Sequence, residues 1–315
     1  MTVPDTPGAP APQPDTPGAP APRPAPAGTP VARSDGPRPA SAGTPAAPPG
    51  TAGVPAPRPA PDRPVSHQLL AGRTVVVTAA AGTGIGFAAA RRCAEEGAHL
   101  VISDRHTRRL AEAADRLAEH TGTRPLAVPC DVTDGDQLDH LMDTAARECG
   151  ALDVLINNAG LGGTASVAEM TDAQWDTVLA TTLTSTFKAT RAALRHMIPA
   201  GRGTIVNNAS VVGWRAQRGQ AHYAAAKAGV MALTRCSALD VAAHGIRVNA
   251  VAPSLAMHPH LAKVAGAELL AELRTREAFG RAAEPWEVAN VMVFLASDYA
   301  SYLTGEVVSV SSQHP

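Results

Sequence analysis

From residue 74 onward, short apolar runs alternate along the chain with longer stretches in which apolar residues recur at helical spacing. The short runs are rich in β-branched residues and contain few polar positions, which is typical of strands buried on both faces. The longer stretches predict helices, including one that carries Tyr223 and a long one from about Asp172. The short runs predict strands at residues 74–79, 99–104, 125–132, 153–160, 203–210, 246–253 and 306–312.

Strands that alternate with helices favour a parallel sheet covered by helices on both faces. Because crossovers between parallel strands are right-handed, such a chain forms a doubly wound sheet. The predicted fold class is therefore α/β, with one domain of about seven strands over residues 65–315. Ligands of such sheets bind beyond the carboxyl ends of the strands, so polar residues at those ends are the candidates for a site.

Residues 1–64 have a different composition. Of the 28 prolines in the chain, 21 lie in this segment, and PDTPGAPAP occurs twice, at Pro4–Pro12 and at Pro14–Pro22. The segment has no aromatic residue and few branched apolar ones, so it cannot bury enough surface to offset the entropy of ordering, and we predict a disordered tail. Two readings stay open: its PxxP stretches could bind a partner domain, or translation could begin near Val65.

Charge and cysteine content argue against several classes of protein. The formal net charge is −1, and residues 65–315 hold 22 basic and 24 acidic side chains, which argues against electrostatic binding of nucleic acid. No run of 18 apolar residues is present, so no membrane span is predicted. The four cysteines lack metal-ligand spacing, so we predict no metal site and interpret them as thiols of a cytoplasmic protein.

The segment TAAAGTGIG, Thr78–Gly86, follows the first predicted strand and opens a helix. Glycines in that position let the backbone approach a pyrophosphate, and the helix N-terminus offers N–H donors and a positive dipole end. We therefore predict a dinucleotide-binding loop; the alternative is a tight turn between strand and helix. The predicted contacts are Gly82, Thr83, Gly84, Ile85 and Gly86.

Asp104 ends the second predicted strand, about twenty residues further on. A carboxylate there can bind the hydroxyls of the adenosine ribose and repel a 2′-phosphate, which favours NAD(H) over NADP(H). Arg105 and Arg108 could neutralise a 2′-phosphate, so NADP(H) stays open. The alternative role for Asp104 is to cap the following helix.

Two further strand ends carry candidates. Asp131 and Val132 lie at the end of the third strand, where the adenine edge of a cofactor could be met, although a turn or cap role for Asp131 is a close alternative. NNAG ends the fourth strand, where asparagine side chains can brace the backbone and Gly160 lets the face of a cofactor approach closely. Asn158, Ala159 and Gly160 are therefore predicted cofactor contacts, with a pure turn role as the alternative.

Tyr223 and Lys227 are four residues apart on a predicted helix, so their side chains share one face. A free phenol, with a pKa near ~10, is a poor base at neutral pH, but a nearby ammonium and an oxidised nicotinamide would lower that pKa. Tyr223 could then exchange the proton of an alcohol while hydride moves to or from the nicotinamide. Ser210, at the end of the fifth strand, could donate a hydrogen bond to the substrate oxygen, and Lys227 could also hold the nicotinamide ribose.

Together these motifs resemble the short-chain dehydrogenase/reductase family of the classical type, over about residues 70–312. The TGxxxGxG motif of the family corresponds to Ala79–Gly86 and its NNAG motif to Asn157–Gly160. Its serine and its YxxxK motif correspond to Ser210, Tyr223 and Lys227. The resemblance implies a Rossmann-like single domain, a nicotinamide cofactor, and a homotetramer or homodimer assembled partly through the two long helices around the fifth strand.

The chain departs from the family pattern at several positions. Ala79 and Ala80 replace the threonine and the first glycine of the glycine motif, and a methyl group at Ala80 would narrow the loop. Thr182 stands where the family has an asparagine that supports a proton-relay water. It is counted among the catalytic candidates because its hydroxyl could bind a water. Pro253, expected at the cofactor, is followed by Ser254 instead of glycine, and the terminal DGG is Ser311–Gln313.

Within the family, segments such as VAPSLAMHPHLAK look like actinobacterial members associated with sterol catabolism. This resemblance implies an NAD(P)-dependent oxidoreductase that interconverts a secondary alcohol and a ketone on a CoA-linked or steroid-derived ring substrate. One alternative is a 3-oxoacyl-ACP or 3-oxoacyl-CoA reductase. The other is an inactive nucleotide-binding scaffold, which the retention of Ser210, Tyr223 and Lys227 speaks against.

A substrate lid is expected over Ser254–Arg281, where apolar residues recur at helical spacing and could close over an apolar ligand. An ordinary helix packed on the core is the alternative. Candidate substrate contacts are Trp214 and Gln217 in the loop after Ser210, His222 next to Tyr223, and Met257 in the lid.

Overall fold

The computed structural model describes residue 59, residues 61–257 and residues 267–313. All of these residues belong to the second of the two units, Met1–Ala52 and Gly53–Pro315, into which the chain divides. Most of the predicted tail at 1–64 and the middle of the predicted lid, 258–266, lie outside the described residues. The tail and its boundary at residue 64 therefore stay predictions.

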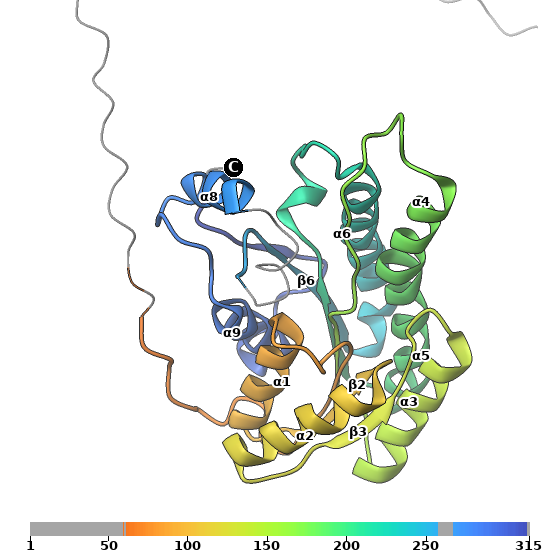
Figure 1. The fold of residues 1–315 in the computed structure, drawn as a ribbon. Helices are drawn as coiled ribbons and strands as arrows, with labels where there is room; N and C mark the ends of the chain where they lie inside the picture. Colours follow the sequence, from red (N-terminus) through yellow and green to blue (C-terminus); the bar gives the residue numbers. More distant parts are fainter. Residues whose placement is uncertain (1–58, 60, 258–266, 314–315) are drawn as a thin grey trace, which may run out of the picture. The chain divides into compact units, whose positions relative to one another are not determined.

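Seven parallel strands form one sheet among the described residues, in the order β3-β2-β1-β4-β5-β6-β7 (Figure 1). β1 pairs with both β2 and β4, so the strand order reverses between β1 and β4, where doubly wound sheets bind their ligands. The predicted α/β fold is confirmed. The strands are β1 (Thr74–Val77), β2 (His99–Asp104), β3 (Leu126–Pro129), β4 (Val154–Asn157), β5 (Gly203–Asn208), β6 (Ile246–Pro253) and β7 (Val307–Val310).

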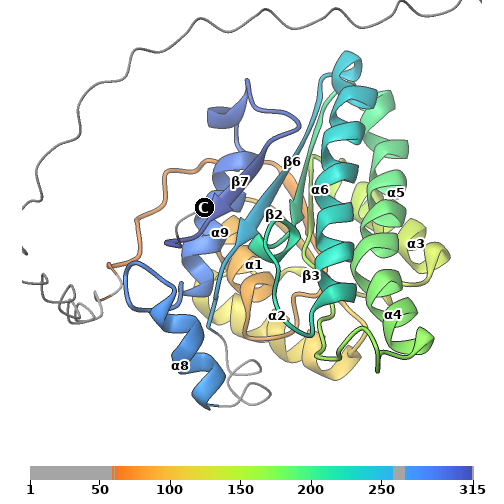
Figure 2. The ribbon, with the colours of Figure 1, turned by 90° about the horizontal axis from the view of Figure 1, so that it is seen from above.

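Helices cover both faces of this sheet (Figure 2). One layer holds α1, α2 and α9, and the other holds α3, α5 and α6. The helices and helical turns are α1 (Ile85–Glu95), α2 (Thr107–Thr121), α3 (Gly135–Cys149), α4 (Asp172–Leu179), η1 (Ala180–Thr184), α5 (Ser185–Ala200), η2 (Val211–Gly213), α6 (Ala221–Val241), η3 (Ala242–His244), α8 (Ala267–Thr275), α9 (Pro285–Ala296) and η4 (Asp298–Ala300).

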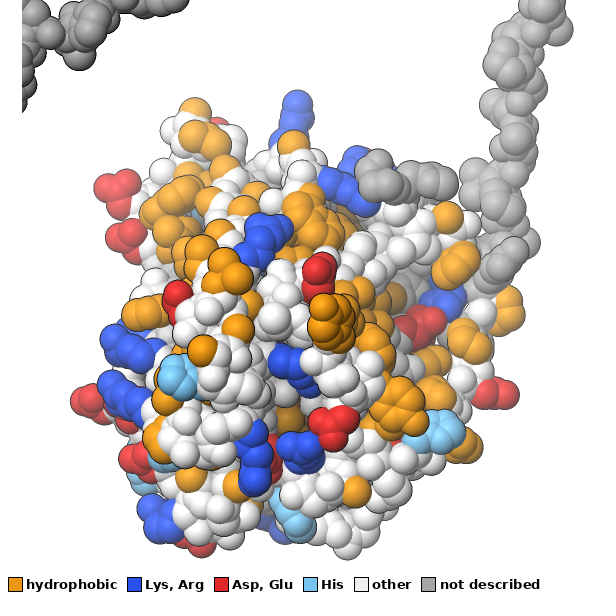
Figure 3. Space-filling view, turned by 180° about the vertical axis from the view of Figure 1, so that it is seen from behind, with side chains coloured by type: hydrophobic (Ala, Val, Ile, Leu, Met, Phe, Trp, Pro, Cys, Tyr) orange, Lys and Arg blue, Asp and Glu red, His pale blue; other side chains and the backbone are white. Residues whose placement is uncertain are grey.

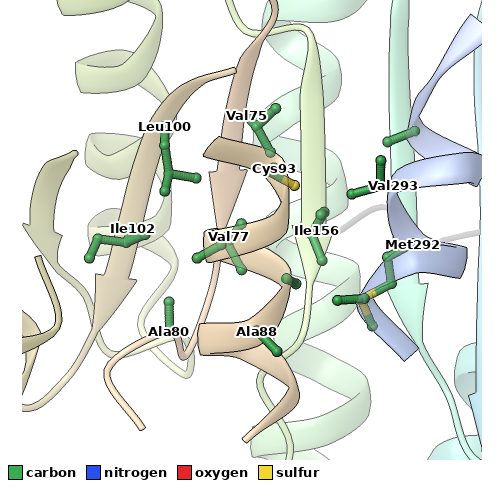
Figure 4. Packing of buried hydrophobic residues seen from close by; sticks show 14 of the residues in the cluster. Val75, Val77, Ala80, Ala88, Cys93, Leu100, Ile102, Ile156, Met292 and Val293 are labelled. Atoms are coloured by element: carbon green, nitrogen blue, oxygen red, sulfur yellow. The ribbon is translucent and has the colours of Figure 1, made fainter. Parts of the chain in front are cut away.

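The two layers have separate apolar cores because successive strand residues point to opposite faces. Val75 and Val77 of β1 pack with α1 and α9, whereas Val76 between them packs on the other side. Figure 4 shows the first core, in which Cys93 of α1 and Met292 of α9 lie over the strands. This arrangement explains the continuous apolar runs of the central strands.

The long helix predicted from about Asp172 is interrupted. α4 begins with a capping box between Thr171 and Gln174, and a π-helical turn, η1, joins it to α5. Such a turn inserts a residue into a helix and rotates the side chains that follow. In this turn Thr182 is fully buried.

A buried carboxylate anchors the segment that leads into β1. Glu96, at the end of α1, is fully buried and pairs with Arg92 one turn earlier. It also accepts hydrogen bonds from the backbone N–H groups of His67, at 3.0 Å, and Leu69, at 2.9 Å. The described chain is thus fastened to α1 before the first strand begins.

Basic and acidic side chains are interspersed on the surface shown in Figure 3, and no continuous basic patch lies on that face. This distribution agrees with the near-neutral charge of residues 65–315 and gives a polyanion no extended footprint there.

We expect Glu96→Ala to lower the free energy of unfolding by about 3 kcal/mol, because it removes the fully buried partner of the Arg92 guanidinium and leaves the N–H groups of His67 and Leu69 without their acceptor. Urea denaturation followed by circular dichroism measures this. Glu95→Ala is the matched control, since Glu95 is partly exposed and its ion pairs should be worth less than about 1 kcal/mol. Equal losses in the two variants would contradict the anchoring role.

Candidate active site

The predicted serine, tyrosine and lysine come together at the carboxyl edge of the sheet. Ser210 lies just beyond β5, and Tyr223 and Lys227 lie on the first turns of α6. The side chains of Ser210 and Tyr223 share a hydrogen bond, and the Nζ atom of Lys227 lies 5.6 Å from the centre of the Tyr223 ring. The fold therefore places all three in one neighbourhood.

The protein alone holds the Tyr223 phenol in its protonated form. Burial raises the pKa of this phenol, and the hydrogen bond with Ser210 opposes that rise. Burial also lowers the pKa of Lys227 to about 8, because the ammonium is withdrawn from water. The lowering of the phenol pKa expected from Lys227 and an oxidised nicotinamide together stays a prediction for the complex.

Lys227 is bound on one side of its ammonium and unobstructed on another. Its Nζ atom donates a hydrogen bond to the carbonyl oxygen of Asn208, the last residue of β5. A Cβ atom on Gly160 would lie 3.3 Å from the same Nζ atom, so the glycine at the end of NNAG keeps this side of the ammonium clear. That clearance is what a cofactor contact at Gly160 and Lys227 requires.

Thr182 supports the loop after NNAG. Its hydroxyl accepts a hydrogen bond from the N–H of Leu161, at 3.0 Å, and donates one to the carbonyl of Leu161, at 3.2 Å. The hydroxyl proton is therefore already engaged by the protein. Water binding by Thr182 stays a prediction and would use the remaining acceptor site of the hydroxyl.

Thr78 and Asn158 join the glycine loop to the end of β4. The Thr78 hydroxyl accepts from the N–H groups of Asn158 and Ala159, at 3.0 and 3.2 Å. The Asn158 Nδ2 atom donates to the carbonyls of Thr78 and Ala79, both at 3.2 Å. These contacts give Asn158 the bracing role predicted for it, whereas its contact with a cofactor stays a prediction.

Sequence reasoning did not single out Asn207 and Asn208. The buried Asn207 accepts from Asn157 Nδ2 at 2.9 Å and donates to the Thr234 hydroxyl of α6 at 2.9 Å. Asn208 donates to Asn158 Oδ1 at 3.0 Å. The sequence signal that could have identified them is the pair of adjacent asparagines at the end of the predicted strand GTIVNN.

The glycine loop packs closely against the protein at Gly86 and is less crowded at Gly82. A Cβ atom on Gly86 would lie 2.4 Å from the carbonyl oxygen of Ala79, so only glycine fits there. At Gly82 an added Cβ atom would make one ordinary van der Waals contact, with the backbone nitrogen of Gly84 at 3.9 Å. The sequence predicts that the methyl group of Ala80 narrows the loop. In the structure it is fully buried in the core with Val77, so it takes no room from the opening (Figure 4).

The N-terminus of α1 completes this cradle. Gly84 is the N-cap of the helix, and no side chain caps it. The N–H groups of the first turn can therefore donate to phosphate oxygens at the positive end of the helix dipole. This uncapped helix end supports the predicted dinucleotide-binding loop, and cofactor contacts of Gly82, Thr83, Gly84, Ile85 and Gly86 stay a prediction.

Asp104 lies beside this loop at the end of β2. Its carboxylate accepts from the N–H of Ala81 at 3.4 Å and from the N–H of His106 at 3.0 Å. Burial raises the pKa of Asp104, and the hydrogen bond from Ala81 and the charges of Arg109 and Arg105 oppose that rise. A surface hollow next to it is lined by Arg105, His106, Thr107, Arg108 and Arg109.

Asp131 forms a turn. Its carboxylate accepts from the N–H of Thr133 at 2.9 Å and from the Thr133 hydroxyl at 2.7 Å, and these bonds lower its pKa. The structure therefore supports the turn role, and contact with adenine stays a prediction. Val132 is half-buried against the core on the α3 side.

Two loops meet over Tyr223. Gln220 Nε2 donates to the carbonyl of Gly163 at 2.7 Å, and the N–H of Ala165 donates to the carbonyl of Gly219 at 3.0 Å. A Cβ atom on Gly162 would lie 3.7 Å from the Tyr223 ring. The loop at 161–165 therefore lies directly against the phenol ring.

The predicted substrate contacts differ in exposure. Trp214 is 47% exposed, Gln217 is half-buried, and His222 is buried with its Nε2 atom facing Gly163. His222 and Trp214 come from the two ends of the loop between Ser210 and Tyr223. Their contact with a substrate stays a prediction.

The described part of the lid packs on itself and on the C-terminal strand. Leu255, Leu270 and Ala282 form a small apolar cluster, and Met257 packs against it. The side chains of residues 258–269 lie outside the described residues. Pro253, the last residue of β6, is buried and pairs with β7.

The replaced terminal motif makes a specific contact. The buried Glu277 carboxylate accepts from the Ser312 hydroxyl at 2.7 Å and from Gln313 Nε2 at 2.8 Å. Arg215, in the loop after Ser210, donates to Gln313 Oε1. The C-terminal residues thereby connect the lid to the loop that precedes Tyr223.

Within the described residues, no helix is long and apolar enough to cross a membrane, and no three or more His, Cys, Asp or Glu side chains are grouped so that they could hold a metal ion.

The sequence matches a family model described as enoyl-(acyl carrier protein) reductase over residues 79–312. A Mycobacterium tuberculosis protein, (5R,7aS)-5-hydroxy-7a-methyl-1-oxo-2,3,5,6,7,7a-hexahydro-1H-indene-carboxyl-CoA reductase, is 63% identical over 250 residues, which are 79% of this chain and 95% of that protein. The cis-4-hydroxycyclohexanecarboxylate dehydrogenase of Sinomonas cyclohexanicum is 46% identical over 247 residues, 77% of this chain and 96% of the relative.

A solved structure is also similar. The crystal structure of a short chain dehydrogenase from Mycobacterium smegmatis superposes with a TM-score of 0.73 at 56% sequence identity, and the match covers 82% of this chain and 99% of that one. The similarity therefore extends over the sheet, its helices and the residues at the carboxyl edge.

The lowered pKa of Lys227 makes stability depend on pH. The pKa of Lys227 is about 8 in the folded chain and about 10.5 in the unfolded chain. Unfolding therefore takes up protons between these pH values, and the free energy of unfolding rises with pH there. Relative to Lys227→Met, the wild type should gain about 3 kcal/mol of unfolding free energy from about pH 7 to about pH 11. Urea denaturation at several pH values measures this, and a difference that does not vary with pH would refute it.

Proposed function

The chain belongs to the short-chain dehydrogenase/reductase family and is an oxidoreductase of alcohol and ketone groups. We propose that it reduces or oxidises a CoA-linked ring substrate with NAD(H), using Tyr223 as general acid and base. The observation that carries this proposal is the convergence of Ser210, Tyr223 and Lys227 beside an open glycine loop.

The proton chemistry follows from the contacts of Tyr223. In the reductive direction the phenol donates its proton to the substrate oxygen, and Ser210 donates a hydrogen bond to the same oxygen as its negative charge grows. The Lys227 ammonium, 5.6 Å from the ring centre, stabilises the phenolate that remains. In the oxidative direction the phenolate accepts the alcohol proton. A bound nicotinamide would supply or accept the hydride.

The cofactor preference rests on Asp104. Its half-buried carboxylate lies at the end of β2 beside the glycine loop, where it would bind ribose hydroxyls and repel a 2′-phosphate. Arg105, Arg108 and Arg109 line the adjacent hollow and would favour the phosphate instead. We assign NAD(H) because the carboxylate is held in place by backbone N–H groups, whereas the three arginines are exposed. The remaining proposed contacts are Asn158–Gly160, Lys227 and Pro253.

The substrate class rests on the relatives. The mycobacterial relative is named for a bicyclic ring carboxyl-CoA, and the Sinomonas relative for a hydroxylated cyclohexane carboxylate. Both names describe a ring that bears an oxygen function and a carboxyl group. The apolar cluster of Leu255, Leu270 and Met257 in the lid suits the hydrocarbon part of such a ring.

We further propose that the enzyme is a cytoplasmic homotetramer or homodimer. A groove between α5 and α6 is lined by Phe187, Leu194, Ile198 and Leu233, and two of these side chains are well exposed. A second copy of the chain would cover this apolar surface.

Replacing Tyr223 by phenylalanine removes the proton donor and keeps the ring. We expect Tyr223→Phe to lower kcat about 1,000-fold and to leave the Kd of NADH within about threefold. Turnover is followed by NADH absorbance and binding by fluorescence. Tyr299→Phe, at an exposed tyrosine of η4, is the control and should retain full activity. Turnover of Tyr223→Phe within a few fold of the wild type would overturn the mechanism.

The cofactor and substrate are tested together by titration with NADH and NADPH, followed by assays with acetoacetyl-CoA and with a bicyclic keto-CoA. We expect NADH to bind at least about tenfold more tightly than NADPH and turnover only on the ring thioester, with Asp104→Ala reducing the preference for NADH. Tighter NADPH binding with turnover of acetoacetyl-CoA would favour a 3-oxoacyl reductase. Binding of neither cofactor would favour an inactive scaffold.

A further inference from the structure

The hydrogen bonds of Asn158 settle the orientation of the Asn208 amide. The Nδ2 atom of Asn158 faces the carbonyls of Thr78 and Ala79, which can only accept. Its Oδ1 atom must therefore face Asn208, and only the Nδ2 atom of Asn208 can donate to it, at 3.0 Å. The Asn208 Oδ1 atom then points away from this chain of amides.

That oxygen atom is buried and has no hydrogen-bond donor within the described residues. Buried carbonyl oxygens in folded proteins nearly always have a donor, so the atom calls for one from outside the described residues. The backbone carbonyl of the same residue already accepts from Lys227 Nζ. Asn208 thus presents one satisfied and one unsatisfied acceptor beside the lysine.

The surroundings indicate which ligand supplies the donor. Asn208 ends β5 two residues before Ser210, and its partner Asn158 belongs to NNAG. The Ser254 hydroxyl, which follows the neighbouring strand β6, is another buried polar atom without a partner among the described residues. Both atoms therefore lie at the carboxyl edge where the proposed nicotinamide must meet Tyr223.

We infer that Asn208 Oδ1 accepts a hydrogen bond from the nicotinamide half of the cofactor, either from its ribose hydroxyl or from its carboxamide N–H. Asn208 is then a positioning residue for hydride transfer. It links the cofactor to Lys227 through its own backbone and to the glycine loop through Asn158 and Thr78. This inference rests on the proposed nicotinamide binding.

Equilibrium binding of NADH, ADP-ribose and ADP to the full-length protein tests this inference. ADP lacks the whole nicotinamide half of the cofactor, whereas ADP-ribose keeps the second ribose and lacks only the nicotinamide ring with its carboxamide. We expect Asn208→Ala to weaken the binding of NADH about tenfold and to leave the binding of ADP unchanged. If the affinity for ADP-ribose falls by the same factor, the ribose hydroxyl is the donor to Asn208. If the affinity for ADP-ribose is unchanged, the carboxamide is the donor. A general loosening of the glycine loop would weaken the binding of NADH and of ADP alike, so the ratio of the two affinities in one variant is insensitive to it.

Asn208→Leu, which fills the volume of the amide, is the second variant should the alanine chain fold poorly. Asn290→Ala is the matched control, since Asn290 on α9 also has a buried Oδ1 atom without a partner. An unchanged NADH-to-ADP ratio in both Asn208 variants, or the same change in Asn290→Ala, would overturn the inference. Failure of the wild type to bind NADH would instead count against the proposed function.

Discussion

The buried and half-buried amides at the ends of β4 and β5 are the constraint on which this site depends. Asn157 and Asn158 each bond to the asparagine beside them on β5, and Asn207 extends one of these bonds to α6. Each such amide would cost about 1–3 kcal/mol if left without partners, so the strands and the helix must keep one register. That register places Ser210 next to Tyr223.

Burial at the same edge determines the protonation states. Lys227 is buried on α6, where its ammonium donates to the carbonyl of Asn208, and the loss of water around it lowers its pKa. Tyr223 is biased toward the neutral phenol by the same desolvation. The protein alone is thus set for donating a proton, and acceptance needs a further positive charge near the ring.

The loops around this edge are held by polar contacts instead of a large core. Gln220 fastens the loop after NNAG against the Tyr223 ring, and Glu277 fastens the lid to the C-terminal residues through Gln313. Arg215 connects the second contact to the loop between Ser210 and Tyr223.

The sequence by itself determined the parallel sheet, because a strand buried on both faces must be apolar throughout, and it determined the pairing of Tyr223 with Lys227, because helical spacing is local. Only the tertiary structure decided the contacts between distant segments. The bond from Asn208 to Asn158 spans 50 residues and exists because β5 lies beside β4. The inward methyl of Ala80 and the π turn at Thr182 depend likewise on packing from other elements. Periodicity reports which side of an element is buried, whereas hydrogen-bond partners depend on strand order.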